Sequence, residues 1–513
     1  MGKPIERRAP MATAIDPAPS NDDLLPNDLG SPDWAASEFA GSDLGDRRLD
    51  KRLIEVAKTL YATPQAPINQ ACEDWSATKA TYRFFGNERV AARSILLPHQ
   101  HKTIERIATQ PLVFHIQDTV YLNYTSHPAT TGLGPIGTSQ QKQRGLVVHD
   151  TLTLTASGLA LGVLTHTVWA RSNTRGAGKK ARRKKSIREK ESRKWIDALE
   201  ECARLTPKGV RDVTICDAES DVFELFAAGQ RLQKELLVRA CQDRCLLGQG
   251  LKLWDFMASQ PVKGYLQIDV PPSDKGARRK ATVTVQFADI ALKAPRHAKA
   301  EMQQQYPSIA VTAIYVKELH PPADVKEPLE WMLLTTVATQ TLEDATQRIE
   351  WYKLRWKIEI FHKVLKSGCN VEKVQFETAE RIKRYLALFV AIAYRILWIR
   401  DISRVCPDAP CTVVLTPHEW KALYTKIHRT TVLPDVLPTA HQVVRWIGAL
   451  GGHLGRKRDG EPGVTAIWRG WQRLTDLADL RLLYYPEAYA TRDAAAPTRS
   501  SASPLRLRVF STG

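Results

Sequence analysis

The chain has 513 residues, more than a single hydrophobic core usually accommodates, so we expect two to four domains. Lysine and arginine number 73 against 55 aspartates and glutamates, which gives a net charge of +18. This excess favours a polyanionic partner, most simply nucleic acid, although it could also serve solubility alone. No secretory signal is recognisable, and the most apolar run, residues 385–394, is too short to span a bilayer. We therefore exclude a membrane protein and expect a buried helix there.

The eight cysteines are scattered along the chain. Cys241 and Cys245 are the closest pair, and neither a second pair nor a histidine follows at zinc spacing. We interpret all eight as reduced core thiols of an intracellular protein.

The N-terminal region divides into a tail and a helical segment. Residues 1–30 are rich in Pro, Asp, Asn and Ala without periodicity, which is typical of disorder. From Pro32 the pattern turns helical, and cations such as Lys79 and Arg83 cluster on short helices with few acids. This pattern indicates a small DNA-binding module, with a plain helical subdomain as the alternative.

The next region alternates strands and helices. The apolar run 112–119 predicts a buried strand that carries Asp118 at its C-terminal end, and residues 144–170 predict a hairpin turning at Ser157-Gly158. After a helix, residues 213–217 repeat the first pattern and end in Asp217. The order of elements predicts a mixed α/β sheet with acids at adjacent strand ends, where sites of α/β proteins are usually built.

Three further segments complete the pattern. Residues 248–336 are β-rich, and from Glu372 the chain is helical until an Ala/Ser/Pro/Thr-rich end. The basic run 179–185 predicts a loop of like charge, which is either a DNA clamp or a solubilising loop.

The stretch from Tyr352 to Lys366 contains no proline or glycine and predicts one helix. Its apolar positions share one arc of a helical wheel, which would face a core. Another arc places a single acid among cations and a phenol: Tyr352, Arg355, Glu359, Lys363 and Lys366. Such a face suits a catalytic carboxylate beside phosphate-binding groups, but a solvated face with ordinary i,i+4 charge pairs would look the same.

Asp118, Asp217 and Glu359 together suggest two-metal catalysis. Cleavage or transfer of a phosphodiester requires an activated nucleophile and a stabilised leaving oxygen, and two Mg²⁺ ions supply both. Mg²⁺ prefers carboxylate oxygen and water, so three carboxylates are sufficient to hold the pair.

The spacing Tyr352-x2-Arg355-x3-Glu359-x6-Lys366 resembles the Y-R-E-K signature of a bacterial insertion-sequence family of DDE transposases, typified by the cut-and-paste transposase of the kanamycin-resistance transposon five. Further motifs are similar to that family, in order, over roughly residues 33–485. They are Tyr82-Arg83-Phe84, Gln117-Asp118-Thr119, Glu189-Lys190-Glu191-Ser192 with Lys194-Trp195, Cys216-Asp217-Ala218-Glu219-Ser220-Asp221, Trp331-Met332-Leu333-Leu334-Thr335, Val414-Leu415-Thr416-Pro417 and Leu450-Gly451-Gly452.

The resemblance implies an α/β fold with a ribonuclease-H-like (DDE) catalytic core and a β-rich insertion, flanked by an N-terminal helical DNA-binding domain and a C-terminal helical domain. The expected order is a disordered tail (1–30), a helical DNA-end-binding domain (31–95), the first part of the core (96–247), the β-rich insertion (248–338), the last part of the core with the catalytic helix (339–378), a helical dimerisation domain (379–490) and a second disordered tail (491–513).

The resemblance also implies roles for individual residues. Asp118, Asp217 and Glu359 hold two Mg²⁺ ions per active site, for which Mn²⁺ substitutes. Phosphates near a DNA hairpin are bound by Tyr352, Arg355 and Lys366, and Trp331 stacks on a flipped base unless it is only a core residue of its strand. The other DNA contacts are Arg239, to a phosphate, and Arg48, Arg52 and Arg83, to the transposon end.

The implied reaction nicks one strand at each transposon end, forms a hairpin, reopens it and joins the end to target DNA. The implied partners are double-stranded DNA and a second copy in a synaptic homodimer, in a cytoplasmic, nucleoid-associated protein. Two alternatives remain at this point, a DNA-binding inhibitor of transposition and a two-metal nuclease of the same fold without strand transfer.

Overall fold

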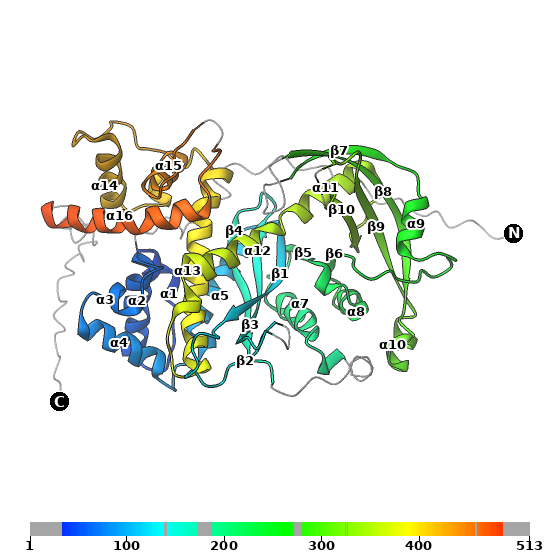
Figure 1. The fold of residues 1–513 in the computed structure, drawn as a ribbon, viewed down its shortest axis with the longest axis horizontal. Helices are drawn as coiled ribbons and strands as arrows, with labels where there is room; N and C mark the ends of the chain where they lie inside the picture. Colours follow the sequence, from blue (N-terminus) through cyan, green and yellow to red (C-terminus); the bar gives the residue numbers. More distant parts are fainter. Residues whose placement is uncertain are drawn as a thin grey trace, which may run out of the picture.

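The computed structural model describes residues 33–485 except 138–140, 173–186, 271–278, 297, 324, 326 and 457–458. The two expected tails and the basic run 179–185 therefore lie outside the described residues. Within these residues, Figure 1 shows N-terminal helices in blue, a central sheet that continues to the right of the view, and C-terminal helices in orange above.

Helices open the described chain: α1 (Trp34–Phe39), α2 (Arg47–Ala62), α3 (Ile68–Cys72), α4 (Trp75–Gly86) and α5 (Ala92–Ala108). Asp33, Asp46 and Asp74 cap α1, α2 and α4, each accepting a backbone N–H of the first turn. The predicted helical segment is therefore confirmed. The sequence did not predict α5, which contains Pro98 and crosses the boundary expected at residue 95.

The core sheet is built from β1 (Leu112–Asn123), β2 (Gly134–Pro135), β3 (Arg144–Thr155), β4 (Ala160–Trp169), β5 (Arg211–Cys216) and β6 (Glu235–Arg239). β1 pairs antiparallel with β3 of the predicted hairpin, and parallel with β5, which pairs parallel with β6. The order β4-β3-β1-β5-β6 has the hairpin on one side of β1 and the parallel strands on the other. It confirms the mixed α/β sheet and fits a ribonuclease-H-like core.

The predicted β-rich segment is also confirmed. It contains α9 (Leu253–Ser259), α10 (Ala300–Gln305) and four strands: β7 (Gly264–Val270), β8 (Arg279–Lys293), β9 (Ser308–Glu318) and β10 (Glu330–Thr335). These four strands are antiparallel, and β10 pairs with β6 of the core. The segment therefore extends the core sheet from its edge at β6. β10 is hydrogen-bonded to β6 on one side and to β9 on the other.

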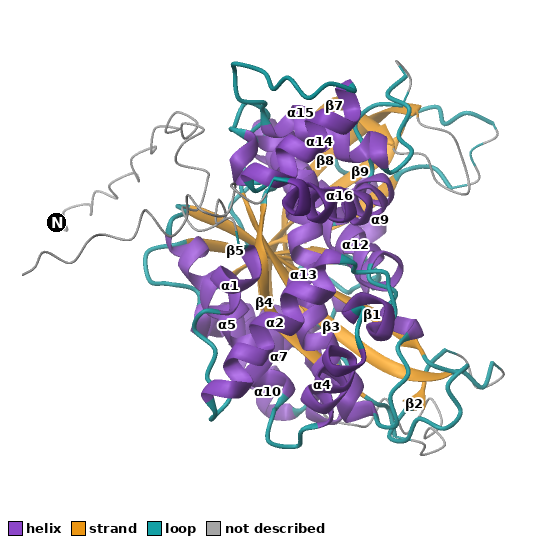
Figure 2. Cartoon of the chain, turned by 90° about the vertical axis from the view of Figure 1, so that its left-hand side faces the viewer, coloured by secondary structure: helices purple, strands orange, loops and turns teal. Residues whose placement is uncertain are grey.

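Helices cover both faces of β1, whose side chains alternate between them. Phe114 and Ile116 face a core shared with α12 (Trp356–Lys363) and the long, mostly buried α13 (Ala379–Val405). Val113 faces the opposite side with Cys202 of α7 (Arg193–Leu205), next to α8 (Phe223–Leu232). Figure 2 shows the helices around the sheet strands from the side. Both faces of β1 are therefore buried, which explains its continuous apolar run.

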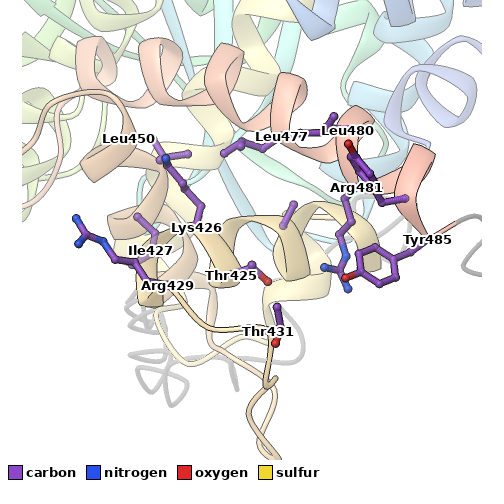
Figure 3. A pocket seen from close by; sticks show the side chains of 12 residues that line it. Thr425, Lys426, Ile427, Arg429, Thr431, Leu450, Leu477, Leu480, Arg481 and Tyr485 are labelled. Atoms are coloured by element: carbon purple, nitrogen blue, oxygen red, sulfur yellow. The ribbon is translucent and has the colours of Figure 1, made fainter.

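The predicted C-terminal helices are confirmed as α13, α14 (Pro417–His428), α15 (Ala440–Leu450) and α16 (Val464–Tyr484). α15 and α16 cross at very close range at Gly470. A Cβ added at this glycine would lie 1.8 Å from the carbonyl oxygen of Ile447. A cavity of about 760 Å³ lies between α14 and α16, with apolar walls that include Ile427, Leu477 and Tyr484 (Figure 3).

All eight cysteines are described and none forms a disulfide. Six are buried, as predicted for core thiols. The prediction is wrong for Cys241 and Cys245, which are exposed because they lie outside the strands, in the turns between β6 and α9.

Candidate active site

Asp118 and Asp217 lie side by side on neighbouring parallel strands. The last residues paired between β1 and β5 are Gln117 and Cys216, and each aspartate comes directly after its paired residue. Asp217 caps the short 3-10 helix η2 (Ala218–Ser220) by accepting the Glu219 N–H at 2.9 Å. Asp118 is not at a strand end as predicted, because β1 continues along β3 to Asn123. The two carboxylates are adjacent even so.

The surroundings of Asp118 are electrostatically strained. Burial raises the pKa of Asp118 to about 6, the nearby His362 opposes this rise, and the negative charge of Asp217 adds to it. One oxygen of Asp118 accepts the Thr119 backbone N–H at 2.8 Å. Two close carboxylates, one of them largely buried, favour a counter-charge between them.

Glu359 lies on α12 and is bound to Arg355, whose Nη2 donates to Glu359 Oε1. The charge of Arg355 also interacts with Asp118. The single helix predicted from Tyr352 to Lys366 is wrong. α11 (Leu342–Lys353) is followed by its C-cap Leu354, and α12 begins after its N-cap Arg355. A π-helical turn, η3 (Val364–Gly368), follows α12.

Tyr352 and Trp331 form an aromatic pair beside Arg355. Their rings meet edge to face with centroids 5.4 Å apart, and Arg355 lies 5.9 Å from the Tyr352 ring. Tyr352 is buried, unlike the exposed face predicted for it, and burial raises its pKa. The charge of Arg239 also reaches Tyr352, while the Arg239 guanidinium donates to the Glu330 carbonyl at 3.3 Å. These residues form one wall beside the acids.

Lys366 lies in η3 on the other flank of β1. Its Nζ donates to the Tyr121 carbonyl at 3.1 Å and lies 3.3 Å from Glu372 Oε1. The Lys366 side chain is about one-third exposed. Lys363, from the same predicted arc, is exposed to solvent. The two lysines therefore differ, although a helical wheel treats them alike.

The sequence analysis did not identify His362 and Asp150. His362 Nε2 lies 3.0 Å from Asp150 Oδ2, and its Nδ1 lies 3.7 Å from Asp118 Oδ2. Asp150 also binds His166 Nδ1 at 2.6 Å, and although burial raises its pKa, the two histidines lower it well below its usual range. His362 follows Glu359 by three residues on α12, so their shared face was the available signal.

The three N-terminal arginines named from sequence come together. Arg48 and Arg52 of α2 and Arg83 of α4 line one hollow of about 450 Å³ together with Lys79. Arg52 is also paired with Glu55 at 2.9 Å on the same helix. A hollow rimmed by four cations suits a phosphate backbone.

The acids fit a hard divalent cation by their chemistry, because all three offer carboxylate oxygen and two of them are adjacent. In the described part of the chain, no three Asp, Glu, His or Cys side chains are already gathered at metal-ligand spacing. Glu359 is held by Arg355 instead.

The mixed sheet carries two adjacent acids, with a basic helical module before it and a helical domain after it. Together these features indicate a DNA-processing enzyme. Comparison with known families gives the class: residues 156–396 match the transposase DDE domain, a span that includes Asp217 and Glu359. Residues 31–90 match the transposase DNA-binding domain, and residues 391–489 match the transposase Tn5 dimerisation domain. The chain is a Tn5-like DDE transposase, a DNA-binding cut-and-paste enzyme that cleaves DNA and transfers strands.

Among solved structures, the cryo-EM structure of the piggyBac transposase synaptic complex with hairpin DNA is similar. The match covers 94% of this chain and 85% of that chain, at 9% sequence identity and a TM-score of 0.32.

The matches have direct consequences for partners and cofactors. The chain binds DNA, forms dimers, and carries a DDE domain of the kind that uses divalent metal ions. No helix among the described residues combines the length and apolarity that a bilayer crossing requires.

Proposed function

We propose that Asp118, Asp217 and Glu359 hold two Mg²⁺ ions, with Mn²⁺ as a substitute, and that this is the active site of the transposase. The adjacency of Asp118 and Asp217 at the end of the β1–β5 pairing, next to the Arg355–Glu359 pair, is the observation that carries the proposal. When bound, the ions activate the attacking oxygen and neutralise the leaving oxygen. Asp118 and Asp217 repel each other when both are ionised, and a bound cation would offset that repulsion.

The residues around the acids would position the DNA strand. Once Glu359 turns to the aspartates, Arg355 is released to bind a phosphate with its bidentate fork. Lys366, on the opposite flank, would take a second phosphate as a point charge, and Arg239 a further one. Tyr352 is buried beneath Trp331 and Arg355, so its hydroxyl would contact a phosphate only from within this wall.

We assign Trp331 to stacking on a flipped base. It is only partly buried and packs against the core on one side, so it is neither a pure core residue nor a free surface residue. Extruding a base costs a few kcal/mol, and stacking on an aromatic ring returns about 1–3 kcal/mol.

End recognition would fall to Arg48, Arg52 and Arg83 around their common hollow. Each end is then processed in four steps. Water cleaves one strand and leaves a 3′-OH, and this 3′-OH attacks the opposite strand to close a hairpin. Water then reopens the hairpin, and the 3′-OH attacks target DNA. Every step exchanges one phosphodiester oxygen for another, so the same site serves all four.

We propose that a homodimer forms in the synaptic complex, through α16. Leu480, Leu483 and Tyr484 are exposed on the last turns of this helix beside the cavity shown in Figure 3. An exposed apolar strip of this kind suits a second copy of the chain. The enzyme would act in the bacterial cytoplasm in association with the nucleoid.

The test uses purified full-length protein, Mg²⁺ and linear DNA that carries the element's own ends. The expected products are hairpinned, flank-free ends. Simple cleavage without hairpins would indicate a nuclease, and binding without cleavage would indicate an inhibitor of transposition.

The matched variants are Glu359→Gln and Glu350→Gln. Glu359→Gln should abolish cleavage and leave end binding largely intact, because the N-terminal module is separate from α12. Glu350→Gln removes an exposed acid of α11 that is paired with Lys353, and it should cleave normally. Cleavage by the Glu359→Gln protein at a near-normal rate would remove Glu359 from the active site.

A further inference from the structure

Three polar residues lie in one row across the core sheet. Asp118 of β1 is directly opposite Asp150 of β3, and Asp150 is directly opposite His166 of β4. Residues directly opposite each other in antiparallel strands project on the same face. The row therefore presents two carboxylates and an imidazole to the face that α12 covers.

Two carboxylates directly opposite each other destabilise a sheet unless a group of opposite polarity lies between them. His362 of α12 occupies this position. Its Nε2 lies 3.0 Å from Asp150 Oδ2, its Nδ1 lies 3.7 Å from Asp118 Oδ2, and the ring is largely buried. One imidazole therefore faces both acids with its two nitrogens.

Asp150 is fully buried, and its contacts explain why a carboxylate is tolerated there. Its Oδ1 accepts from His166 at 2.6 Å and its Oδ2 faces His362, so both oxygens have partners. A buried acid held from two sides has little freedom, and it fixes the ring plane of each histidine. His166 contacts Asp150, whereas His362 contacts Asp150 and also faces Asp118, so the two histidines share one partner and differ toward Asp118.

We propose that His362 is a positioning residue for Asp118, and that Asp150 acts through His362 to hold it in place. The Thr119 N–H then holds Oδ1 of Asp118, and the His362 ring faces Oδ2 at 3.7 Å. Buried partners that orient a metal-ligating carboxylate typically change metal affinity by about 10- to 100-fold when they are lost. This inference rests on the proposed role of Asp118 as a metal ligand.

The experiment measures Mn²⁺ binding to the full-length protein by calorimetry and by the Mn²⁺ electron paramagnetic resonance signal, neither of which requires turnover. His362→Gln keeps an N–H that can reach Asp150 but removes the nitrogen that faces Asp118. We expect this variant to bind Mn²⁺ about tenfold more weakly. His166→Gln removes the other histidine partner of Asp150 and should change Mn²⁺ affinity by less than about twofold, outside the range that loss of such a partner produces.

Asp150→Asn completes a double-mutant cycle. It should weaken Mn²⁺ binding in the wild-type background and have no added effect when His362 is already Gln. Thermal unfolding of the two histidine variants supplies the structural readout, and we expect similar losses because both remove a partner of the same buried acid. Equal Mn²⁺ affinities for the His362→Gln and His166→Gln proteins would overturn the proposal.

Asp118→Asn separates this inference from the function on which it rests. If Asp118→Asn binds Mn²⁺ as the wild type does, the metal site itself is wrongly placed. If Asp118→Asn loses Mn²⁺ and His362→Gln does not, the metal site stands and the positioning role of His362 is wrong.

Discussion

Lys357 of α12 and Asp401 of α13 form an ion pair with 2.8 Å between Nζ and Oδ2, and the Asp401 side chain is fully buried. Arg400 pairs with the other oxygen of Asp401 at 2.6 Å. The pair joins the helix that carries Glu359 to the part of α13 that matches the dimerisation domain. Removing Lys357 takes away the cation at Oδ2 of this buried carboxylate, which keeps Arg400 at Oδ1. Loss of one partner of a buried charge is destabilising.

Lys357→Met should therefore lower the free energy of unfolding by about 3 kcal/mol, measured by urea denaturation. Lys353→Met is the matched control, because Lys353 is an exposed lysine one turn earlier whose pairing with Glu350 is worth less than about 1 kcal/mol. Equal losses of unfolding free energy in the two variants would show that the Lys357–Asp401 pair stabilises the protein no more than an exposed pair does.

Gly470 reverses the usual effect of glycine in a helix. An exposed Gly→Ala change inside a helix stabilises by roughly 0.5–1 kcal/mol. At Gly470 the added Cβ would meet the Ile447 carbonyl at 1.8 Å, so α15 and α16 would have to separate, at about 1–3 kcal/mol. Gly470→Ala should lower the midpoint of thermal unfolding, whereas Gly41→Ala, in open space, should leave it unchanged.

The lowered pKa of Glu38 predicts that the stability of the protein depends on pH. Burial raises the pKa of Glu38, but the charges and hydrogen bonds of Arg106 and His99 outweigh burial and lower it from 4.5 to about 2. A group with a depressed folded-state pKa contributes stability that is complete above its unfolded pKa and is lost as the pH falls toward the folded pKa. The contribution is therefore complete at pH 7 and declines below pH 4.5.

Glu38→Gln should accordingly be less stable than wild type by about 3 kcal/mol at pH 7, because Arg106 stays buried in α5. The difference should shrink in urea unfolding curves recorded from pH 4.5 downward. A difference that is constant over this range would mean that the ionised carboxylate is not the stabilising species.

The elements that the sequence predicted well are those whose pattern is local. Alternation of apolar residues predicts the hairpin at residues 144–170 and the four strands between Gly264 and Thr335. Helical spacing predicts the C-terminal helices. The adjacency of Asp118 and Asp217 was predictable because both end an apolar run and parallel strands align such ends. The fold class and the two candidate aspartates could therefore be predicted from local patterns.

The features that the sequence did not predict depend on contacts between distant residues. His362 and Asp150 are 212 positions apart, and the Arg106–Glu38 contact spans 68 positions. The break at Leu354 follows strong helix formers, so packing rather than propensity sets it. The same holds for β1, which continues past Asp118 because β3 offers it partners as far as Gly145.

Glu372 restrains Lys366 in the DNA-free protein, at 3.3 Å from Nζ. Glu372→Gln should keep an acceptor for the Asn123 N–H, which now donates to Glu372 at 2.7 Å, and should remove the competing charge. Nonspecific DNA binding should tighten by up to about fivefold at low salt, the most that a partly exposed pair usually contributes.

The gain should disappear in a Lys366→Met background, since Lys366 is the group that is released. Glu377→Gln is the control, because it removes the same charge from a neighbouring acid that pairs with Arg381 instead. If both Gln variants tighten binding equally, net charge alone explains the effect.

Substitution of Trp331 should affect two steps of the proposed reaction unequally. If the indole stacks on a flipped base only as the hairpin closes, Trp331→Ala should slow hairpin formation about 5- to 150-fold, the equivalent of about 1–3 kcal/mol of stacking. First-strand nicking precedes that base position and should be slowed much less. The measurement is a gel time course that resolves nicked and hairpinned ends on the same DNA.

The packing of Trp331 supplies the competing explanation for that result. Its ring contacts Tyr352 edge to face, so Trp331→Ala also loosens the wall beside Arg355. Loss of packing would impair both steps alike, because the roles proposed for Arg355 and the acids include nicking. Tyr265→Ala, which removes an exposed aromatic of β7 in the same sheet, controls for the strand surface and should leave both rates unchanged. Unequal slowing of the two steps therefore distinguishes a base-stacking role from a structural one.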